Sequence, residues 1–219
     1  MLILVTDLLA CPRCGPEFGL LVLAERLEER RVVEGRLGCP NCREAYPVRG
    51  GVADLRLPGA AAPAAEEGAP ADPEAAVRLA ALMGLAGLAG MALVVGPGAR
   101  HAGAIAALVP DAEVIAVEGA PRAAGEPGVS RLLAGPGPLP LRGGLLRAAA
   151  LTGGAADEAA LHEGLRVLAP GGRLVVDLAP PEAAPRLRAA GATLLLEEEG
   201  VAVATAPGRP VELLRNTVR

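Results

Sequence analysis

Apolar and polar positions alternate along residues 74–206 in blocks that predict strands separated by helices. Continuous apolar runs, typical of strands buried on both faces, occur at MALVVG, AEVIAVEG, VSRLLAG, LLRAAALTG and GRLVVDLAP. Helices are predicted at ARHAGAIAALVP, EAAPRLRAAG and DEAALHEGLRVL, where Leu161, Leu165 and Leu168 share one face. ATLLLEEEGVAVATAP predicts a closing hairpin that turns near Gly200. This order predicts an α/β fold with a doubly wound, mostly parallel sheet and an antiparallel terminal hairpin.

The first helix of this region has a defined start. Asp72-Pro73-Glu74 places a capping side chain before a proline at the first helical position, so we expect a helix to about residue 89. The preceding segment, PGAAAPAAEEGAPADP, has few large apolar side chains and is typical of a linker. The predicted division is an N-terminal domain over 1–57, a linker over 58–73, a second domain over 74–206 and a C-terminal tail over 207–219.

The 21 uncharged residues between Arg78 and Arg100 are long enough to be considered as a membrane span. Many are Ala or Gly, and Gly96-Pro97-Gly98 interrupts the end of the run, so a helix followed by a buried strand is the better interpretation. The apolar start, MLILVTDLLA, lacks the basic region and the small-residue cleavage site of a signal peptide. We therefore expect a soluble, cytoplasmic protein.

Composition narrows the choice of partners. The formal net charge is −4, from 21 basic residues, all of them Arg, and 25 acidic ones, so no basic field favours nucleic acid. The aromatic side chains are Phe18 and Tyr46, and residues 74–219 therefore offer none on which a nucleic-acid base could stack. RNA as a partner is supported neither by charge nor by aromatic residues.

Four cysteines occur as two pairs, in CPRC and CPNC. Each pair forms a tight turn that aims two thiolates at one point, and LLVLAERLEERRVVEGRL can supply a hairpin that brings the two turns together. Four thiolates suit a tetrahedral structural zinc ion with no open position for chemistry. Two disulfides would need an oxidising compartment, and a redox pair normally opens a helix in a βαβ unit. We therefore predict a β-rich zinc ribbon with the metal ligands Cys11, Cys14, Cys39 and Cys42.

The residues around the cysteines resemble a known family. LLACPRC and GCPNCREAYPVRGGVADL, over roughly residues 7–57, are similar to the zinc ribbon of the small activator subunits that bind and stabilise RNA and protein methyltransferases. The two cysteine pairs and the turn from Tyr46-Pro47 to Gly51 agree together. The resemblance implies that the ribbon contacts a protein partner, such as a methyltransferase or a larger complex.

A second resemblance covers residues 74–206. LHEGLRVLAPGGRLVVDLAP is similar to the segment that joins the fourth helix to the fifth strand in class I S-adenosylmethionine-dependent methyltransferases. The resemblance implies a Rossmann-like fold that binds S-adenosylmethionine at the carboxyl ends of its central strands. It assigns Gly96 and Gly98 to the glycine loop beside the methionine end, and Glu118 to the ribose hydroxyls.

Some positions depart from that family's pattern. Val94 stands where an acid is expected before the loop. Arg100 replaces the third glycine, where it could fill the methionine pocket or pair with the ligand carboxylate. The segment 134–147 supplies neither the acid expected near the adenine nor an aromatic residue. His101 and His162 are better explained as helix residues than as catalytic groups, so no catalytic residue is assigned.

Two functions from different classes follow. In the first, the methyltransferase-like domain is a non-catalytic or weakly active pseudoenzyme that acts as a scaffold or partner subunit. In the second, the protein is an active S-adenosylmethionine-dependent methyltransferase of RNA, protein or a small molecule, since proximity and orientation of the methyl donor can carry much of the barrier. The replaced cofactor-binding groups favour the first.

Overall fold

The computed structural model describes residues 1–57, 71–87, 89–118, 125–153, 157–198 and 200–208. The predicted linker over 58–73 lies outside these residues except for its last three. The predicted tail over 207–219 lies outside them except for its first two.

The N-terminal region consists mainly of short strands. Its elements are η1 (Ile3–Leu8), β1 (Ala10–Cys11), β2 (Gly15–Gly19), β3 (Leu21–Glu28), β4 (Arg31–Gly38), β5 (Ala45–Arg49) and β6 (Val52–Asp54). The hairpin predicted from LLVLAERLEERRVVEGRL forms as β3 and β4. It turns at Glu29 and Arg30, whose φ angles of 46° and 65° are left-handed. Such angles match the turn to the twist of the flanking strands.

The second region alternates strands and helices. Its elements are α1 (Pro73–Met83), β7 (Gly90–Val95), η2 (Pro97–His101), α2 (Ala102–Leu108), β8 (Ala112–Glu118), β9 (Val129–Leu133), β10 (Leu146–Leu151), α3 (Glu158–Val167), β11 (Leu168–Asp177), α4 (Ala183–Ala189), β12 (Thr193–Glu198) and β13 (Val201–Thr205). As predicted, Asp72 caps α1, because its carboxylate accepts the amide of Glu74 at 3.0 Å. The helix ends before residue 89, since Gly84 takes a left-handed conformation with φ of 67°.

The uncharged run between Arg78 and Arg100 is divided between the end of α1, β7 and the start of η2. Among the described residues, no helix has both the length and the apolar character needed to cross a membrane.

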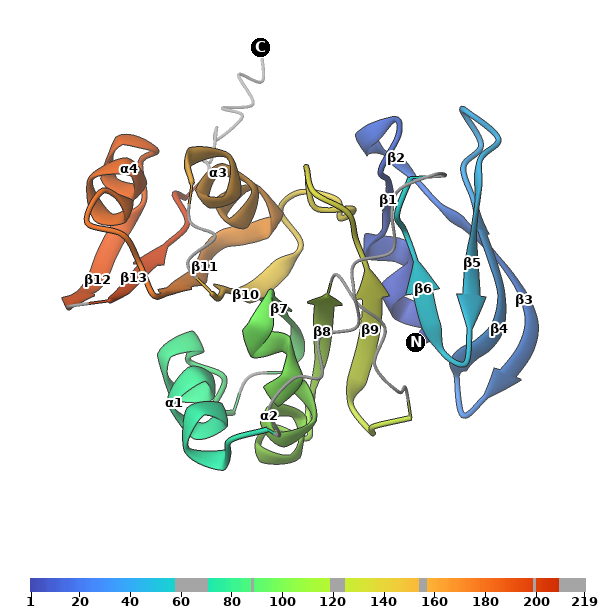
Figure 1. Cartoon of the computed structure of the whole chain (residues 1–219), viewed down its shortest axis with the longest axis horizontal. Coiled ribbons are helices and arrows are strands. Elements are labelled where there is room, and N and C mark those ends of the chain that lie inside the picture. The colour runs from blue at the N-terminus through green and yellow to red at the C-terminus, as the bar shows by residue number, and fades with distance from the viewer. Residues whose placement is uncertain (58–70, 88, 119–124, 154–156, 199, 209–219) are drawn as a thin grey trace, which may run out of the picture.

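Within the described part of the chain, eleven strands form one sheet in the order β12-β13-β11-β10-β7-β8-β9-β6-β5-β4-β3 (Figure 1). The strands from β11 to β9 are parallel, whereas β13 is antiparallel to both of its neighbours. Helices α1 and α2 cover one face and α3 and α4 the other. The doubly wound prediction therefore describes the second region. The sheet as a whole is mixed, because β3 to β6 pair antiparallel.

The N-terminal region joins the sheet through β6. This strand pairs in parallel with β9, with Val52 opposite Arg131 and Asp54 opposite Leu133. The amide of Leu55 continues the ladder by donating to the carbonyl of Leu133 at 2.8 Å. The ribbon is thus an extension of the second region's sheet.

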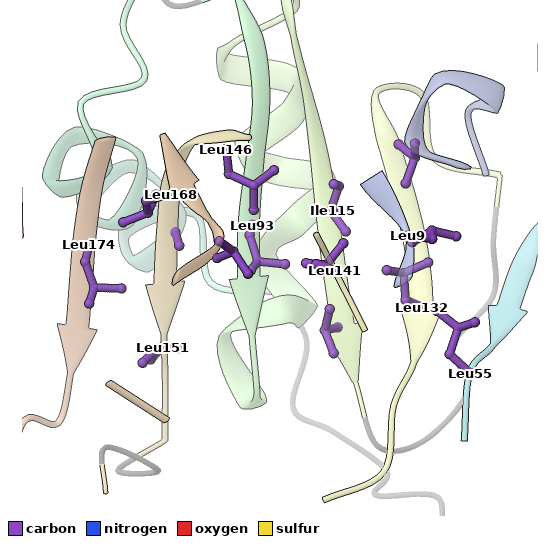
Figure 2. Close-up of a cluster of buried hydrophobic side chains, with 14 of the residues drawn as sticks. Leu9, Leu55, Leu93, Ile115, Leu132, Leu141, Leu146, Leu151, Leu168 and Leu174 are labelled. Atoms are coloured by element: carbon purple, nitrogen blue, oxygen red, sulfur yellow. The ribbon is translucent and has the colours of Figure 1, made fainter. Parts of the chain in front are cut away.

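A second backbone contact lies at the other end of the ribbon. Ala10 donates its amide to the carbonyl of Pro140 at 3.0 Å, and Arg142 donates to that of Leu8 at 2.7 Å. Beneath these contacts, leucines of both regions belong to one cluster of buried side chains (Figure 2). The cluster runs from Leu9 and Leu55 of the ribbon to Leu132, Leu141, Leu93 and Leu174 of the second region. The two regions therefore share a core.

An ion pair crosses the same junction. Arg31, at the start of β4, donates two hydrogen bonds of 2.9 Å to the carboxylate of Glu113 on β8 and a third of 2.9 Å to the carbonyl of Val129. The hydroxyl of Ser130 donates to the same carboxylate at 2.6 Å. Glu113 is buried, so its charge depends on these donors for compensation.

We predict that Glu113→Gln lowers the free energy of unfolding by about 3 kcal/mol, because it leaves the Arg31 guanidinium without its counter-charge. The matched control is Glu197→Gln, which removes the exposed pair with Arg188 and is expected to cost less than about 1 kcal/mol. Urea unfolding measures both values. Equal effects would show that the Arg31–Glu113 pair does not stabilise the junction.

Candidate functional site

The four cysteines meet at one point of the ribbon. Cys11 ends β1, Cys14 follows in the next turn, and Cys39 and Cys42 lie in the turn between β4 and β5. All four are free thiols whose sulfur atoms lie within 4.8 Å of one another. The Sγ–Sγ distances are 3.7 Å for Cys11 and Cys42, and 3.8 Å for Cys14 and Cys39. A tetrahedral ion with metal–sulfur bonds of about 2.3 Å places its sulfurs about 3.8 Å apart, so the cluster could hold such an ion.

The backbone shapes the second turn. Cys39 donates its amide to the carbonyl of Glu44 at 2.9 Å and accepts the amide of Arg43 at 3.0 Å. Arg43 has a φ angle of 61°, which turns the chain so that Glu44 pairs with Cys39 and closes the turn that contains Cys42. The two thiols of this pair are thereby aimed at the first pair.

The thiols influence one another's charge. Burial raises the pKa of Cys11, but hydrogen bonds from Tyr46 and from backbone amides outweigh it and lower this pKa to about 7. At Cys42, a hydrogen bond from the backbone amide of Glu44 lowers the pKa, whereas burial and the three other thiols raise it to about 12. Repulsion therefore opposes four thiolates at this spacing, and a divalent cation would remove that opposition.

The predicted glycine loop lies at the end of β7, beside the point where the order of the strands reverses. Gly96 has a φ angle of 86°. A Cβ atom on Gly96 would lie 2.6 Å from the carbonyl oxygen of Thr152, and one on Gly98 would lie 2.6 Å from the Thr152 methyl group. Both glycines are therefore needed for close approach to Thr152, which directly follows β10.

The Thr152 hydroxyl is hydrogen-bonded to the backbone amide of the glycine loop. It accepts the hydrogen bond of the Gly98 amide at 2.7 Å and donates to the carbonyl of Val95 at 2.7 Å. Loop amides of this kind can bind an anionic group of a ligand. Here the Gly98 amide is buried and already has the Thr152 hydroxyl as its acceptor.

The other residues of the loop are also engaged. Val94 is fully buried in the core. Arg100 lies with its Nε atom 3.1 Å from Nε2 of the buried His101, whose Nδ1 atom accepts the amide of Asp72 at 3.1 Å. The two alternatives for Arg100, filling the methionine pocket or pairing with the ligand carboxylate, stay predictions. His162 is exposed on α3 and belongs to neither cluster.

Glu118 ends β8, where a ribose-binding acid was expected. Its carboxylate forms an ion pair with Arg131 of β9, which also pairs with Glu126. The side chains of Arg131 and Glu118 are only 6% and 10% exposed. The charge assigned to ribose recognition is therefore compensated by a buried guanidinium.

A small cavity lies at the same edge of the sheet. It is lined by Gly96, Thr152, Leu139 and Glu163 among others, and its volume is about 120 Å³. Sites for small organic ligands usually measure about 300–1,000 Å³, so the cavity that the described residues enclose is smaller than such sites.

Sequence reasoning missed Thr152, Arg131 and Tyr46 as residues of these sites. Arg131 carried a weak signal, since it is a charged residue within the apolar run VSRLLAG. Thr152 carried none, because its importance depends on the distance between the ends of β7 and β10. Tyr46 stood out only as part of the resemblance.

The N-terminal region is similar to a known protein family. Residues 3–51 match the family model described as Trm112p-like protein. The expected resemblance of the ribbon to the methyltransferase activators is confirmed. No curated protein matched the chain.

Solved structures similar to this chain include the antibiotic-resistance methyltransferase Kmr, with 25% identity and a TM-score of 0.44 over 61% of this chain and 93% of that one. A complex between the Haloferax volcanii Trm112 methyltransferase activator and a putative methyltransferase matches with 15% identity and a TM-score of 0.45 over 61% and 89%. Burkholderia thailandensis 1,6-didemethyltoxoflavin-N1-methyltransferase matches with 18% identity and a TM-score of 0.44 over 62% and 80%.

We predict that Thr152→Ala lowers the free energy of unfolding by about 1–3 kcal/mol more than Thr152→Ser does. Both variants remove the methyl group, but only alanine leaves the buried Gly98 amide without an acceptor. Urea unfolding of the two variants measures the difference. Equal stabilities would mean that the hydroxyl does not satisfy this amide.

Proposed function

We propose that the chain is a fusion in which a structural zinc ribbon stabilises its own methyltransferase-like domain. The second domain acts as a non-catalytic or weakly active scaffold. In this proposal the ribbon covers residues 1–57 and the second domain covers residues 74–206. A shared sheet joins the two.

Zinc is the proposed metal, with Cys11, Cys14, Cys39 and Cys42 as its ligands. The donor set and spacing support this choice, because four thiolates within tetrahedral reach are typical of structural zinc. The bound ion would neutralise the thiolates and link the two turns, and it would leave no position open for substrate. Zinc binding by thiolates requires reduced cysteines, which is compatible with a reducing compartment such as the cytoplasm.

The scaffold role rests on one observation above others, the hydrogen bond from the Gly98 amide to the Thr152 hydroxyl. An amide that a cofactor would need is already used, and opening it would cost the protein a buried hydrogen bond. The Glu118–Arg131 pair supports the same proposal at the other end of the expected cofactor site.

The partner of the ribbon is proposed to be the second domain of the same chain. The β6 edge and the backbone of Leu8 and Ala10 are hydrogen-bonded to that domain. A separate methyltransferase would have to displace β9 from β6 or bind the ribbon through another surface.

An active S-adenosylmethionine-dependent methyltransferase is the second candidate. It is favoured by the position of Gly96 beside the switch point of the sheet and by the carboxylate of Glu118 at the end of β8. This candidate requires the cofactor to replace Thr152 and Arg131 as partners of these groups.

Calorimetric titration of the full chain with S-adenosylmethionine separates the two candidates. We expect no binding at millimolar cofactor, because both polar groups of the site have internal partners. Thr152→Ser is the matched control, since it retains the hydroxyl and is expected to behave in the same way. Micromolar binding that Glu118→Ala weakens tenfold or more would overturn the scaffold proposal.

A further inference from the structure

The hydroxyl group of Tyr46 lies beside the cysteine cluster. Tyr46 is on β5, and its side chain is only 1% exposed. Its Oη atom lies 3.4 Å from Sγ of Cys11, within hydrogen-bonding distance for sulfur. A tyrosine hydroxyl ordinarily keeps its proton at neutral pH, so it can donate this hydrogen bond to the sulfur.

The ring of Tyr46 is buried in a hydrophobic cluster that extends through both regions. It belongs to the same buried cluster as Leu9, Leu55 and Leu132, and its backbone is in register with Leu37 on β4. Because the ring is packed in this core, its hydroxyl has little freedom to turn away from Cys11. The position of the donor is therefore set by the fold before any metal binds.

A donor held in this way should favour a charged sulfur at one defined position. Hydrogen bonds from outer groups to metal ligands orient those ligands, and their loss typically costs about 10–100-fold in metal affinity. The effect is greatest where water cannot replace the donor, and both Cys11 and Tyr46 are buried.

We propose that Tyr46 is a positioning residue of the metal centre, whose hydroxyl holds the Cys11 thiolate in its ligating position and thereby retains the metal. This inference rests on the proposed zinc ribbon. It goes further by assigning a determinant of metal affinity outside the cysteines.

Asn41 provides a matched control on the other side of the cluster. Its Nδ2 atom donates to Sγ of Cys14 at 3.3 Å, but Asn41 is exposed. Water can take the place of this amide when it is removed. Asn41→Ala should therefore change the metal affinity much less than Tyr46→Phe, although each substitution deletes one hydrogen bond to a thiolate.

The test uses the full zinc-loaded chain and a chromophoric chelator that competes for zinc. Tyr46→Phe keeps the ring and removes only the hydroxyl, and we expect it to weaken zinc binding by about 10–100-fold. Asn41→Ala is expected to weaken it by no more than a few-fold. Equal zinc affinities for wild type and Tyr46→Phe would overturn the inference while leaving the zinc ribbon intact.

Two further measurements complete the test. One checks the zinc ribbon itself, and the other distinguishes metal retention by Tyr46 from a contribution to core packing alone. The first is the zinc content of the wild-type chain: if it holds no zinc, the zinc ribbon itself is wrong and the inference falls with it. The second is urea unfolding with and without zinc. The inference predicts that Tyr46→Phe destabilises the zinc-loaded chain more than the metal-free chain. Equal destabilisation in the two states would overturn it.

Discussion

The parallel pairing of β6 with β9 is the constraint on which the rest of the structure depends. Only Val52, Ala53 and Asp54 form β6, yet they align the whole ribbon with the sheet of the second region. An unpaired β9 would expose backbone donors and acceptors at the edge of the sheet, where they favour pairing with other chains. The ribbon covers that edge and moves the free edge to β3. Register shifts between β3 and β4 interrupt its regular ladder, which discourages further pairing.

The metal cluster and the junction depend on each other. The cysteines hold the turn between β4 and β5, and β5 in turn aligns β6 against β9. The second region in turn contributes Leu132 and Leu141 to the buried cluster to which Tyr46 also belongs. A domain as small as the ribbon buries too little surface on folding to be very stable alone. Packing in the second region also places Thr152 against the glycine loop. The Thr152 hydroxyl there accepts the hydrogen bond of the Gly98 amide.

Local patterns predicted most of the elements, whereas contacts distant in sequence were not predictable. Apolar runs predicted the strands from β7 to β11, because these depend on neighbouring residues. The cysteine cluster is the exception among distant contacts, because two CxxC pairs together supply the four ligands that a structural zinc ion needs. The end of α1 was misplaced, since several glycines follow it and the sequence does not show that Gly84 takes the left-handed conformation. The division into separate domains did not reveal the β6–β9 pairing, which joins residues on either side of the linker. Thr152 and Arg131 gain their roles only from the adjacency of strands, which no local pattern encodes.

The central claim is that the ribbon and the second domain fold as one unit through this junction. Scanning calorimetry of the full chain, with zinc and after its removal by a chelator, tests the claim most directly. The account predicts a single transition with equal van't Hoff and calorimetric enthalpies, which moves as a whole to lower temperature when zinc is removed. Two transitions, of which only one responds to zinc, would contradict it.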